Sequence, residues 1–378
     1  MHVAILYNGY ISRDTGTSER VFQIANGLAS LGVRLTFSGA KEHYSEAPIP
    51  PNLLVITMPN RMLKLAGIFA WIARLVACGL TDRYDVVQIE SFSLPRSLAL
   101  FLLLHPLSRK SVIVFHDKYF EQDPRKSIVG GLNLALQRTL LILFDASITP
   151  GLSVRKWFKE LHGDLVNKMV TIPNGTPNFD MKKNVDNLHL RKKYGIEPNA
   201  FVALFFGSMT FKPNHEAALY LYGLSDSISQ RFEKTTEKRL VFIIAGVGSE
   251  TLPKTEHFVP MGFVKDLNEL LSLPDAIVLP HLSSYSGPHV KTIYAFLSRK
   301  PVIASEDAVK DMLRLIPGEH FLPFDINEPD TLLESLTKLY HNKESGKHLA
   351  LNAYLYSKKF SWKLVSSMHL ELYEKMMS

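Results

Sequence analysis

The sequence predicts an α/β protein of two Rossmann-like domains, each built on a parallel β-sheet, and three observations support this prediction. Short apolar strand candidates alternate with helical stretches along the chain. The alternation stops once, in the polar and charged residues 178–199, and then begins again. The length of 378 residues agrees with two domains, because a single core seldom grows past about 250 residues.

The first domain opens with the strand, loop and helix of a Rossmann unit. Residues 2–7 are apolar and β-prone, the loop 8–16 contains two glycines, and apolar residues then recur at helical spacing until Gly32. The further elements that we expect are strands at 33–38, 53–57, 85–89, 111–115, 146–149 and 169–172, and a helix over 127–143. This order is typical of a doubly wound parallel sheet.

The second domain repeats the pattern. Its expected elements are strands at 201–206, 240–245, 276–279 and 301–304, and helices at 216–228, 266–271, 290–297, 331–340 and 345–356. We therefore place the first domain at 1–178 and the second at 179–358, and we expect their sheets to face each other across a cleft.

Composition and charge restrict the class of protein. With 46% hydrophobic and 21% charged residues, the chain is typical of a globular protein and excludes a disordered or collagen-like one. The net charge is +7, mostly from the first half, which suits a polyanion, an anionic membrane surface or a phosphorylated small molecule. No basic run with interleaved aromatic residues favours nucleic acid.

Other features exclude further classes of site. The single Cys78 forms no internal disulfide and the histidines are scattered, so we expect neither a disulfide scaffold nor a bound metal. The first ten residues enter a strand at once and lack a signal-peptide pattern, so we expect a cytoplasmic protein.

The stretch Leu63–Leu80 is the most apolar part of the first domain. Lys64 and Arg74 interrupt it, and it is too short to cross a bilayer, which takes about 20 apolar residues. Two interpretations stay open. It is a core helix of the Rossmann domain, or it is an amphipathic helix that lies on a membrane surface.

Several common catalytic motifs are absent from the sequence. It has no P-loop, no serine nucleophile elbow, no H-E-x-x-H helix and no Asp-x-Asp pair. The loop 8–16 leads into a helix start with Thr17 and Ser18, where free backbone N–H groups favour an anion or a polar ligand. Gly246 and Gly248 form only half of a dinucleotide fingerprint, so a cofactor such as NAD is not expected.

The segment 279–305 is the stronger candidate for an anion site. An apolar strand ends at Pro280, and a Ser- and Gly-rich loop then runs into a helix. The backbone N–H groups of His289 and Val290 would face the carboxyl edge of the sheet, and Lys291 could neutralise a phosphate. The alternative is a structural loop followed by a solvated lysine.

The order of motifs along the chain resembles that of the retaining glycosyltransferases of GT-B fold, family four (glycosyl transferases group 1). The motifs are Gly16-Thr17-Ser18-Glu19-Arg20, Ile172-Pro173-Asn174-Gly175, Phe206-Gly207-Ser208-Met209, Ala245-Gly246-Val247-Gly248, Gly262-Phe263-Val264 and Lys300-Pro301-Val302-Ile303-Ala304-Ser305. The closing residues 360–373 resemble the helix that crosses back to the first domain in that family. The resemblance therefore assigns 359–378 to such a helix.

The resemblance implies that a sugar moves, with retention of configuration and without a metal, from a nucleotide sugar on the second domain to an acceptor at the first. It gives the catalytic roles to His116 and Asp117, at the transferred sugar, and to Lys291, at the diphosphate. It implies Asn8 and Glu90 for the acceptor. It implies these residues for the donor: Gly16, Ser208, Lys212, Gly246, Val264, Ser286, Gly287, Pro288, His289, Val290 and Tyr294. These residues also have non-catalytic interpretations. Asp117 and Glu90 could be helix caps or surface charges, and His116 could be a histidine of the cleft whose hydrogen bonds are satisfied within the protein.

One departure from the family bears on activity. The family usually has two glutamates eight positions apart, where this chain has Ser286 and Tyr294. A carboxylate accepts two hydrogen bonds from a ribose diol, whereas tyrosine offers one hydroxyl. A GT-B scaffold or partner subunit without transfer activity therefore stays open, and so does a nucleotide-sugar 2-epimerase. For an enzyme, we expect a glycan or lipid-linked sugar as acceptor, with peripheral contact to the inner face of the membrane.

Overall fold

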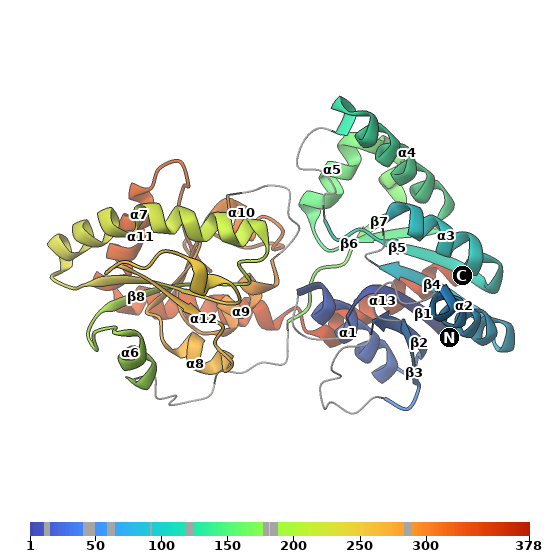
Figure 1. Ribbon diagram of the computed structural model, residues 1–378, viewed down its shortest axis with the longest axis horizontal. Coiled ribbons are helices and arrows are strands. Elements are labelled where there is room, and N and C mark those ends of the chain that lie inside the picture. Colours follow the sequence, from blue (N-terminus) through green and yellow to red (C-terminus); the bar gives the residue numbers. More distant parts are fainter. Residues whose placement is uncertain are drawn as a thin grey trace. The chain divides into compact units, whose positions relative to one another are not determined.

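The computed structural model describes residues 1–10, 16–40, 50–58, 65–90, 93–117, 124–176, 181, 188–282 and 289–378. The chain divides into two compact units. Unit 1 comprises Met1–Gly175 and Phe360–Ser378, and unit 2 comprises Thr176–Lys359. Each unit contains one parallel β-sheet with helices packed against it, so the predicted pair of Rossmann-like domains is confirmed (Figure 1).

Unit 1 is built on a seven-stranded parallel sheet. Its strands are β1 (His2–Tyr10), β2 (Arg34–Ala40), β3 (Leu53–Met58), β4 (Tyr84–Glu90), β5 (Ser108–Val114), β6 (Ala146–Thr149) and β7 (Met169–Thr171). They lie in the order β3-β2-β1-β4-β5-β6-β7, so the direction of winding reverses between β1 and β4. Ligands of doubly wound sheets bind at the carboxyl ends of strands near such a reversal.

Two apolar cores cover the two faces of this sheet. The helices of unit 1 are α1 (Gly16–Ser30), α2 (Leu65–Thr81), α3 (Leu94–Leu104), α4 (Ile128–Leu143), α5 (Leu152–His162) and α13 (Trp362–Met377). Because side chains alternate along a strand, Val86 and Val112 pack toward α1 and α13, whereas Val87 and Ile113 pack toward α2–α5.

The last helix of the chain belongs to unit 1 and packs beside α1. Its first residue, Trp362, covers Gly175 so closely that a β-carbon on Gly175 would lie 2.3 Å from the indole ring. Only glycine fits at this position. The Ile-Pro-Asn-Gly segment and the closing Phe-Ser-Trp segment, which are far apart in the sequence, thus pack against each other.

Unit 2 is built on a six-stranded parallel sheet. Its strands are β8 (Phe201–Phe206), β9 (Leu240–Ala245), β10 (Phe258–Gly262), β11 (Ala276–Leu279), β12 (Val302–Ala304) and β13 (Leu322–Pro323). The order β10-β9-β8-β11-β12-β13 places the reversal of winding between β8 and β11. The carboxyl ends of β8 and β11 therefore mark the expected ligand edge of this unit.

The helices of unit 2 complete its fold. They are α6 (Leu188–Tyr194), α7 (Lys212–Thr236), α8 (Leu267–Ser272), α9 (Val290–Leu297), α10 (Glu306–Val309), α11 (Asp330–His341) and α12 (Lys343–Lys358). Helix α7 packs beside α11, and α9 packs beside α12. Among the described helices of both units, none combines the length and the apolar character needed to cross a bilayer.

Candidate functional site

The candidate residues of unit 1 meet at the ends of two neighbouring strands. Glu90 ends β4, and His116 follows the end of β5 by two residues. The ring Nε2 of His116 lies 2.9 Å from Oε2 of Glu90, and Oε1 of Glu90 accepts a hydrogen bond from Nε2 of Gln88. Glu90 is fully buried, and both of its oxygens are occupied within the protein.

The surroundings of Glu90 keep it ionised. Burial by itself would raise the pKa of Glu90, but the hydrogen bond that it accepts from His116 and the positive charge of Arg20 hold the pKa below its ordinary value. Because the carboxylate accepts, Nε2 of His116 donates, and Nδ1 is left as the acceptor of the ring. The His116 side chain keeps 10% of its surface exposed and Glu90 none, so His116 is the member that a ligand can reach.

Arg20, from the Glu-Arg pair of α1, joins two of the sequence motifs. Its guanidinium donates to the carbonyl oxygens of Pro173 at 2.7 Å and Ile172 at 3.0 Å, and to Oδ1 of Asn174 at 3.0 Å. Burial lowers the pKa of Arg20 to about 10, against the charge of Glu90, so it stays cationic at neutral pH. Arg20 therefore fixes the chain after β7 and adds a buried positive charge that stabilises ionised Glu90.

Helix α13 contributes two more buried polar side chains. The hydroxyl of Tyr373 lies 3.4 Å from Nδ1 of His369, while Nε2 of His369 has no hydrogen-bond partner among the described residues. Burial lowers the pKa of His369 to about 3 and raises that of Tyr373 well above its ordinary value. Both side chains are therefore neutral near pH 7.

The other predicted residues of unit 1 are Asn8, Gly16 and Asp117. Asn8 lies in the last part of β1, and its side chain is outside the described atoms; Gly16 begins α1. Asp117 follows His116 and is exposed to solvent. The roles of these three residues stay predictions.

In unit 2, Lys291 is the second residue of α9, and its side chain turns into the sheet edge. Its Nζ donates to Oδ1 of Asn214 on α7 and lies 4.9 Å from the ring centroid of Phe205 on β8. The same nitrogen is 3.1 Å from the point that a β-carbon on Gly207 would occupy. Burial lowers the pKa of Lys291 to about 7. An anion at this edge would therefore restore the full positive charge of Lys291.

A stacked pair of histidines lies on the approach to α9. The rings of His281 and His289 are 3.8 Å apart and 5° from parallel. His281 is fully buried, and neither of its ring nitrogens has a hydrogen-bond partner within the described residues. Burial, together with the charge of Lys291, lowers the pKa of His289 to about 3 and that of His281 well below its ordinary value. The pair is therefore neutral at physiological pH.

Gly246 holds the ends of β8 and β9 together at this edge. A β-carbon on Gly246 would lie 2.0 Å from the carbonyl oxygen of Gly207, so a larger residue does not fit. The backbone N–H of Gly207 donates to the carbonyl of Ala245 at 2.9 Å. The loops after these strands and the start of α9 therefore meet, which brings Gly207, Gly246 and Lys291 into one place.

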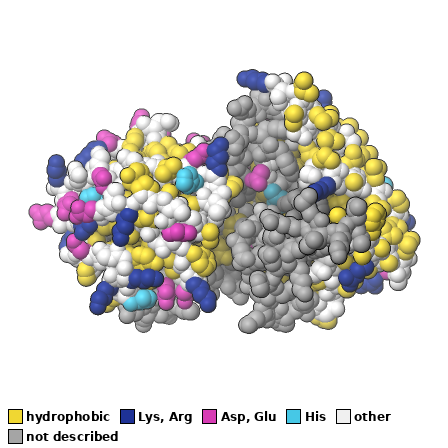
Figure 2. Space-filling model, in the orientation of Figure 1, with side chains coloured by type: hydrophobic (Ala, Val, Ile, Leu, Met, Phe, Trp, Pro, Cys, Tyr) yellow, Lys and Arg dark blue, Asp and Glu magenta, His cyan; other side chains and the backbone are white. Residues whose placement is uncertain are grey.

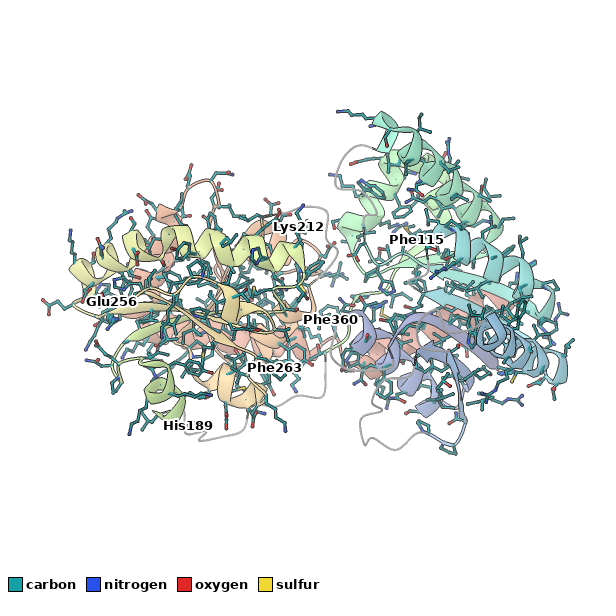
Figure 3. The ribbon with its side chains drawn as sticks, viewed as in Figure 1. Phe115, His189, Lys212, Glu256, Phe263 and Phe360 are labelled. Atoms are coloured by element: carbon teal, nitrogen blue, oxygen red, sulfur yellow. The ribbon has the colours of Figure 1, made fainter. Side chains whose placement is uncertain are left out.

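The remaining predicted donor residues lie on several elements of unit 2. Ser208 has its hydroxyl 2.7 Å from that of Thr210. Lys212 begins α7 with an exposed side chain (Figure 3). Its Nζ is 3.9 Å from Oε1 of Glu216. Val264 lies in the loop after β10, Val290 is the first residue of α9, and partly buried Tyr294 is one turn further along α9.

Three of the predicted donor residues, Ser286, Gly287 and Pro288, lie outside the described residues. Across the described ranges, no three His, Cys, Asp or Glu side chains gather into a group that could hold a metal ion.

Sequence reasoning missed the side chains that support the predicted ones. Gln88, His369 and Tyr373 complete the Glu90 network, and Asn214 and His281 complete the surroundings of Lys291. The sequence contains a signal for one of them, Gln88. It is a polar residue at a core-facing position of the strand, two residues before Glu90.

Two family models match the chain. Residues 15–177 match the model of Glycosyltransferase Family 4, and residues 200–342 match that of Glycosyl transferases group 1. The first match covers most of unit 1 and the second most of unit 2. No curated protein matches this chain.

Solved structures share this architecture over the full chain. HepE of Anabaena in complex with UDP has a TM-score of 0.71 and 17% identity, covering 99% of this chain and 100% of that one. A glycosyltransferase from Rickettsia africae has a TM-score of 0.70 and 16% identity, covering 100% and 98%. Sucrose-phosphate synthase from Thermosynechococcus elongatus has a TM-score of 0.72 and 13% identity, covering 100% and 99%. At these identities the likeness shows a common fold.

Proposed function

Because the chain belongs to the GT-B glycosyltransferases, with a family 4 domain followed by a group 1 domain, we propose that it moves a sugar from a nucleotide-sugar donor to an acceptor with retention of configuration. The observation that carries this proposal is the position of Lys291. Its Nζ lies at the carboxyl edge of the unit 2 sheet, against Gly207 and Asn214.

The donor diphosphate binds at this edge of unit 2. The first N–H groups of α9 point away from the helix and attract an anion, and Lys291 supplies a positive charge beside them. These groups stabilise the charge that develops on the leaving diphosphate, which removes the need for a metal. HepE was crystallised with UDP and with UDP-glucose, which makes uridine nucleotides the first donors to test.

The transferred sugar contacts His116 of unit 1. Since Nε2 of His116 donates to Glu90, Nδ1 is free of that bond and accepts a hydrogen bond from a sugar hydroxyl. Glu90 has both oxygens occupied, so it acts through His116, which it orients. We assign Asp117 to the same sugar and Asn8 to the acceptor, following the resemblance of the motifs.

The acceptor is a glycan or a lipid-linked sugar. The support for a lipid-linked one is the excess of basic residues in the first half of the chain, which an anionic leaflet would attract. Tyr294, where the family has a glutamate, makes the ribose contact weaker than a carboxylate would.

Thermal-shift binding is the experiment that tests the donor site. UDP, GDP, ADP and their common sugar conjugates are added to the protein and to Lys291→Ala, with EDTA present throughout. We expect one nucleotide to raise the melting temperature of the wild type, because a ligand that binds only the folded state stabilises it. The shift should be absent in Lys291→Ala.

Lys300→Ala is the matched control, because Lys300 is also a largely buried lysine of unit 2, with Nζ bonded to the carbonyl of Ser272 at 3.0 Å. It should keep the nucleotide shift. If no nucleotide shifts the wild type, the proposal of a donor site is wrong and the scaffold interpretation replaces it. Release of epimerised nucleotide sugar without any acceptor would instead favour an epimerase. Retention is read from the anomeric configuration of the product by NMR.

A further inference from the structure

Three neighbouring helices of unit 1 contain no acidic residue. Over their combined lengths, α2, α3 and α4 carry three charged side chains, Arg74, Arg96 and Arg138, and all three are exposed. A surface helix of a globular protein normally has charges of both signs on its solvent side. Helix α7 of unit 2 follows that rule with exposed Asp226, Arg231 and other charged residues.

The solvent sides of these helices are apolar. Ile128 is 93% exposed and Leu132 64% exposed on α4, Leu102 is 63% exposed on α3, and Leu80 is 71% exposed on α2. Single exposed apolar side chains are ordinary, but a continuous apolar surface on one side of a domain marks a place of contact.

The exposed apolar residues belong to one surface, because the inner sides of the three helices pack on the same face of the sheet. Trp71 of α2, Leu100 of α3 and Leu140 of α4 lie in one core cluster. The rings of Phe101 and Phe144 at the ends of α3 and α4 are 4.8 Å apart. We call the outer side of α2, α3 and α4 the helical face. Figure 2 shows hydrophobic side chains gathered over the part of it that α3 and α4 form.

Basic residues border the helical face. Arg125 and Lys126 are exposed in the short 3-10 turn directly before α4, next to Ile128. Helix α5, which is tied to α4 by a hydrogen bond of 2.9 Å between His162 and Gln137, adds the exposed residues Arg155 and Lys156.

We propose that the helical face docks on an anionic lipid bilayer. The apolar side chains enter the boundary between headgroups and acyl chains, and the arginines and lysines contact lipid phosphates. A second copy of the chain fits less well, because two such faces would bring arginine against arginine. The sequence indicates a membrane contact at Leu63–Leu80, with a second strongly apolar segment at Ser97–Leu104, and the helical face extends further onto α4.

The docking also orients unit 1. Helix α4 begins on the carboxyl side of β5, the side at which Glu90 and His116 lie, so its apolar first turn brings that edge of the sheet toward the lipid. This consequence for a lipid-linked acceptor rests on the proposed function, but the docking itself does not.

Co-sedimentation with vesicles tests the proposal without any sugar donor. One set of vesicles is phosphatidylcholine alone, and the other is an equal mixture of phosphatidylcholine and phosphatidylglycerol. We expect the wild type to sediment with the mixed vesicles and less at high salt. The double substitution Ile128→Ser and Leu132→Ser should weaken partitioning about tenfold or more, because both side chains leave water on docking.

The matched control replaces Leu351 and Leu355 by serine, since these are exposed leucines of α12 in unit 2. Both double variants should melt like the wild type, and only the first should lose vesicle binding. Lys291→Ala should bind vesicles normally, which separates this test from that of the donor site. Wild-type protein that stays in the supernatant, or equal binding by both double variants, overturns the proposal. So does a dimer of the wild type that only the first double variant abolishes.

Discussion

The hydroxyl of Tyr373, in the last helix of the chain, donates a hydrogen bond of 2.6 Å to Oε1 of Gln88 on β4. The amide of Gln88 then donates to Glu90, and Glu90 accepts from His116. This series of bonds fixes which way the Gln88 amide points. Helix α13 therefore helps to orient a carboxylate at the ligand edge of the sheet, as well as covering the core.

Tyr373→Phe should lower turnover by a few fold while leaving the KM for the donor unchanged. Without the hydroxyl, the Gln88 amide and then Glu90 and His116 are held less firmly, whereas the donor site of unit 2 keeps all its contacts. The buried Oε1 of Gln88 would also lose its partner, which costs about 1–3 kcal/mol in the free energy of unfolding. Steady-state kinetics and urea unfolding measure the two effects.

The control is Tyr356→Phe in unit 2, whose hydroxyl donates to the carbonyl of Leu313 at 2.8 Å. It should lose similar stability and keep normal turnover. Equal turnover in both variants would show that Tyr373 only packs.

His369 should make the protein less stable in mild acid. Its pKa is about 3 in the folded state and about 6.5 in an unfolded chain, so between these values only the unfolded state takes up the proton. The contribution of His369 is complete above pH 6.5 and is lost as the pH falls toward 3. At pH 5 the loss is about 2 kcal/mol.

The variant His369→Phe removes this proton uptake. Between pH 8 and pH 5 it should therefore lose about 2 kcal/mol less of its unfolding free energy than the wild type. Urea unfolding at the two pH values measures the difference. His189→Phe on α6, where the histidine side chain is 55% exposed, should follow the wild type. A parallel decline of wild type and His369→Phe contradicts the assignment.

Most of the sheet could be predicted from sequence, since buried parallel strands are short apolar runs. The predicted strands 201–206, 240–245 and 276–279 coincide with β8, β9 and β11. Strand β10 was missed because Pro260 and Gly262 interrupt its five residues, and it lies at an edge of the sheet where proline is tolerated. Strand β13 was missed because it has two residues.

The candidate site was predictable only in part. Glu90, His116 and Lys291 stand at the ends of strands or the start of a helix, which sequence patterns locate. Gln88 lies two residues before Glu90 on the same strand, but its partner Tyr373 and the partner of Lys291, Asn214, depend on which helix covers which strand end, and these pairs join residues far apart in the chain. The burial that lowers the pKa of Lys291 to about 7 depends on the same packing.

Lys291→Ala should reduce kcat/KM about a hundredfold, and Lys212→Ala by a smaller factor. Removing a buried charge that faces a leaving diphosphate costs about 3 kcal/mol of transition-state stabilisation. Lys212 is exposed and already lies near Glu216, so water screens its contribution. Initial rates at several donor concentrations give both values, with Lys300→Ala as the unaffected control. A larger loss of kcat/KM in Lys212→Ala than in Lys291→Ala would mean that Lys212 on α7 makes the main contact with the diphosphate.

Donor binding should weaken as the pH rises above 7. In the free protein the pKa of Lys291 is about 7, and a bound diphosphate raises it, so binding above pH 7 requires the uptake of a proton. The dissociation constant should therefore rise up to tenfold for each pH unit until the pKa of the complex is reached. Calorimetry between pH 6 and pH 9 measures it. The ligand in this experiment is a nucleotide sugar. The terminal phosphate of a free nucleoside diphosphate loses a proton near pH 6 and would add its own pH dependence to the binding.

Lys291→Arg provides the decisive comparison, because arginine stays charged over this whole range. Its affinity should be nearly independent of pH, even where the changed geometry makes it weaker than the wild type at pH 6. In two buffers of different ionisation enthalpy, the wild type should also show proton uptake near pH 8 and the variant none. A wild-type affinity that stays flat from pH 6 to pH 9 means that Lys291 is already charged in the free protein, or that it does not touch the diphosphate. Loss of binding in Lys291→Ala separates these two cases, since only a contacting lysine is needed for affinity.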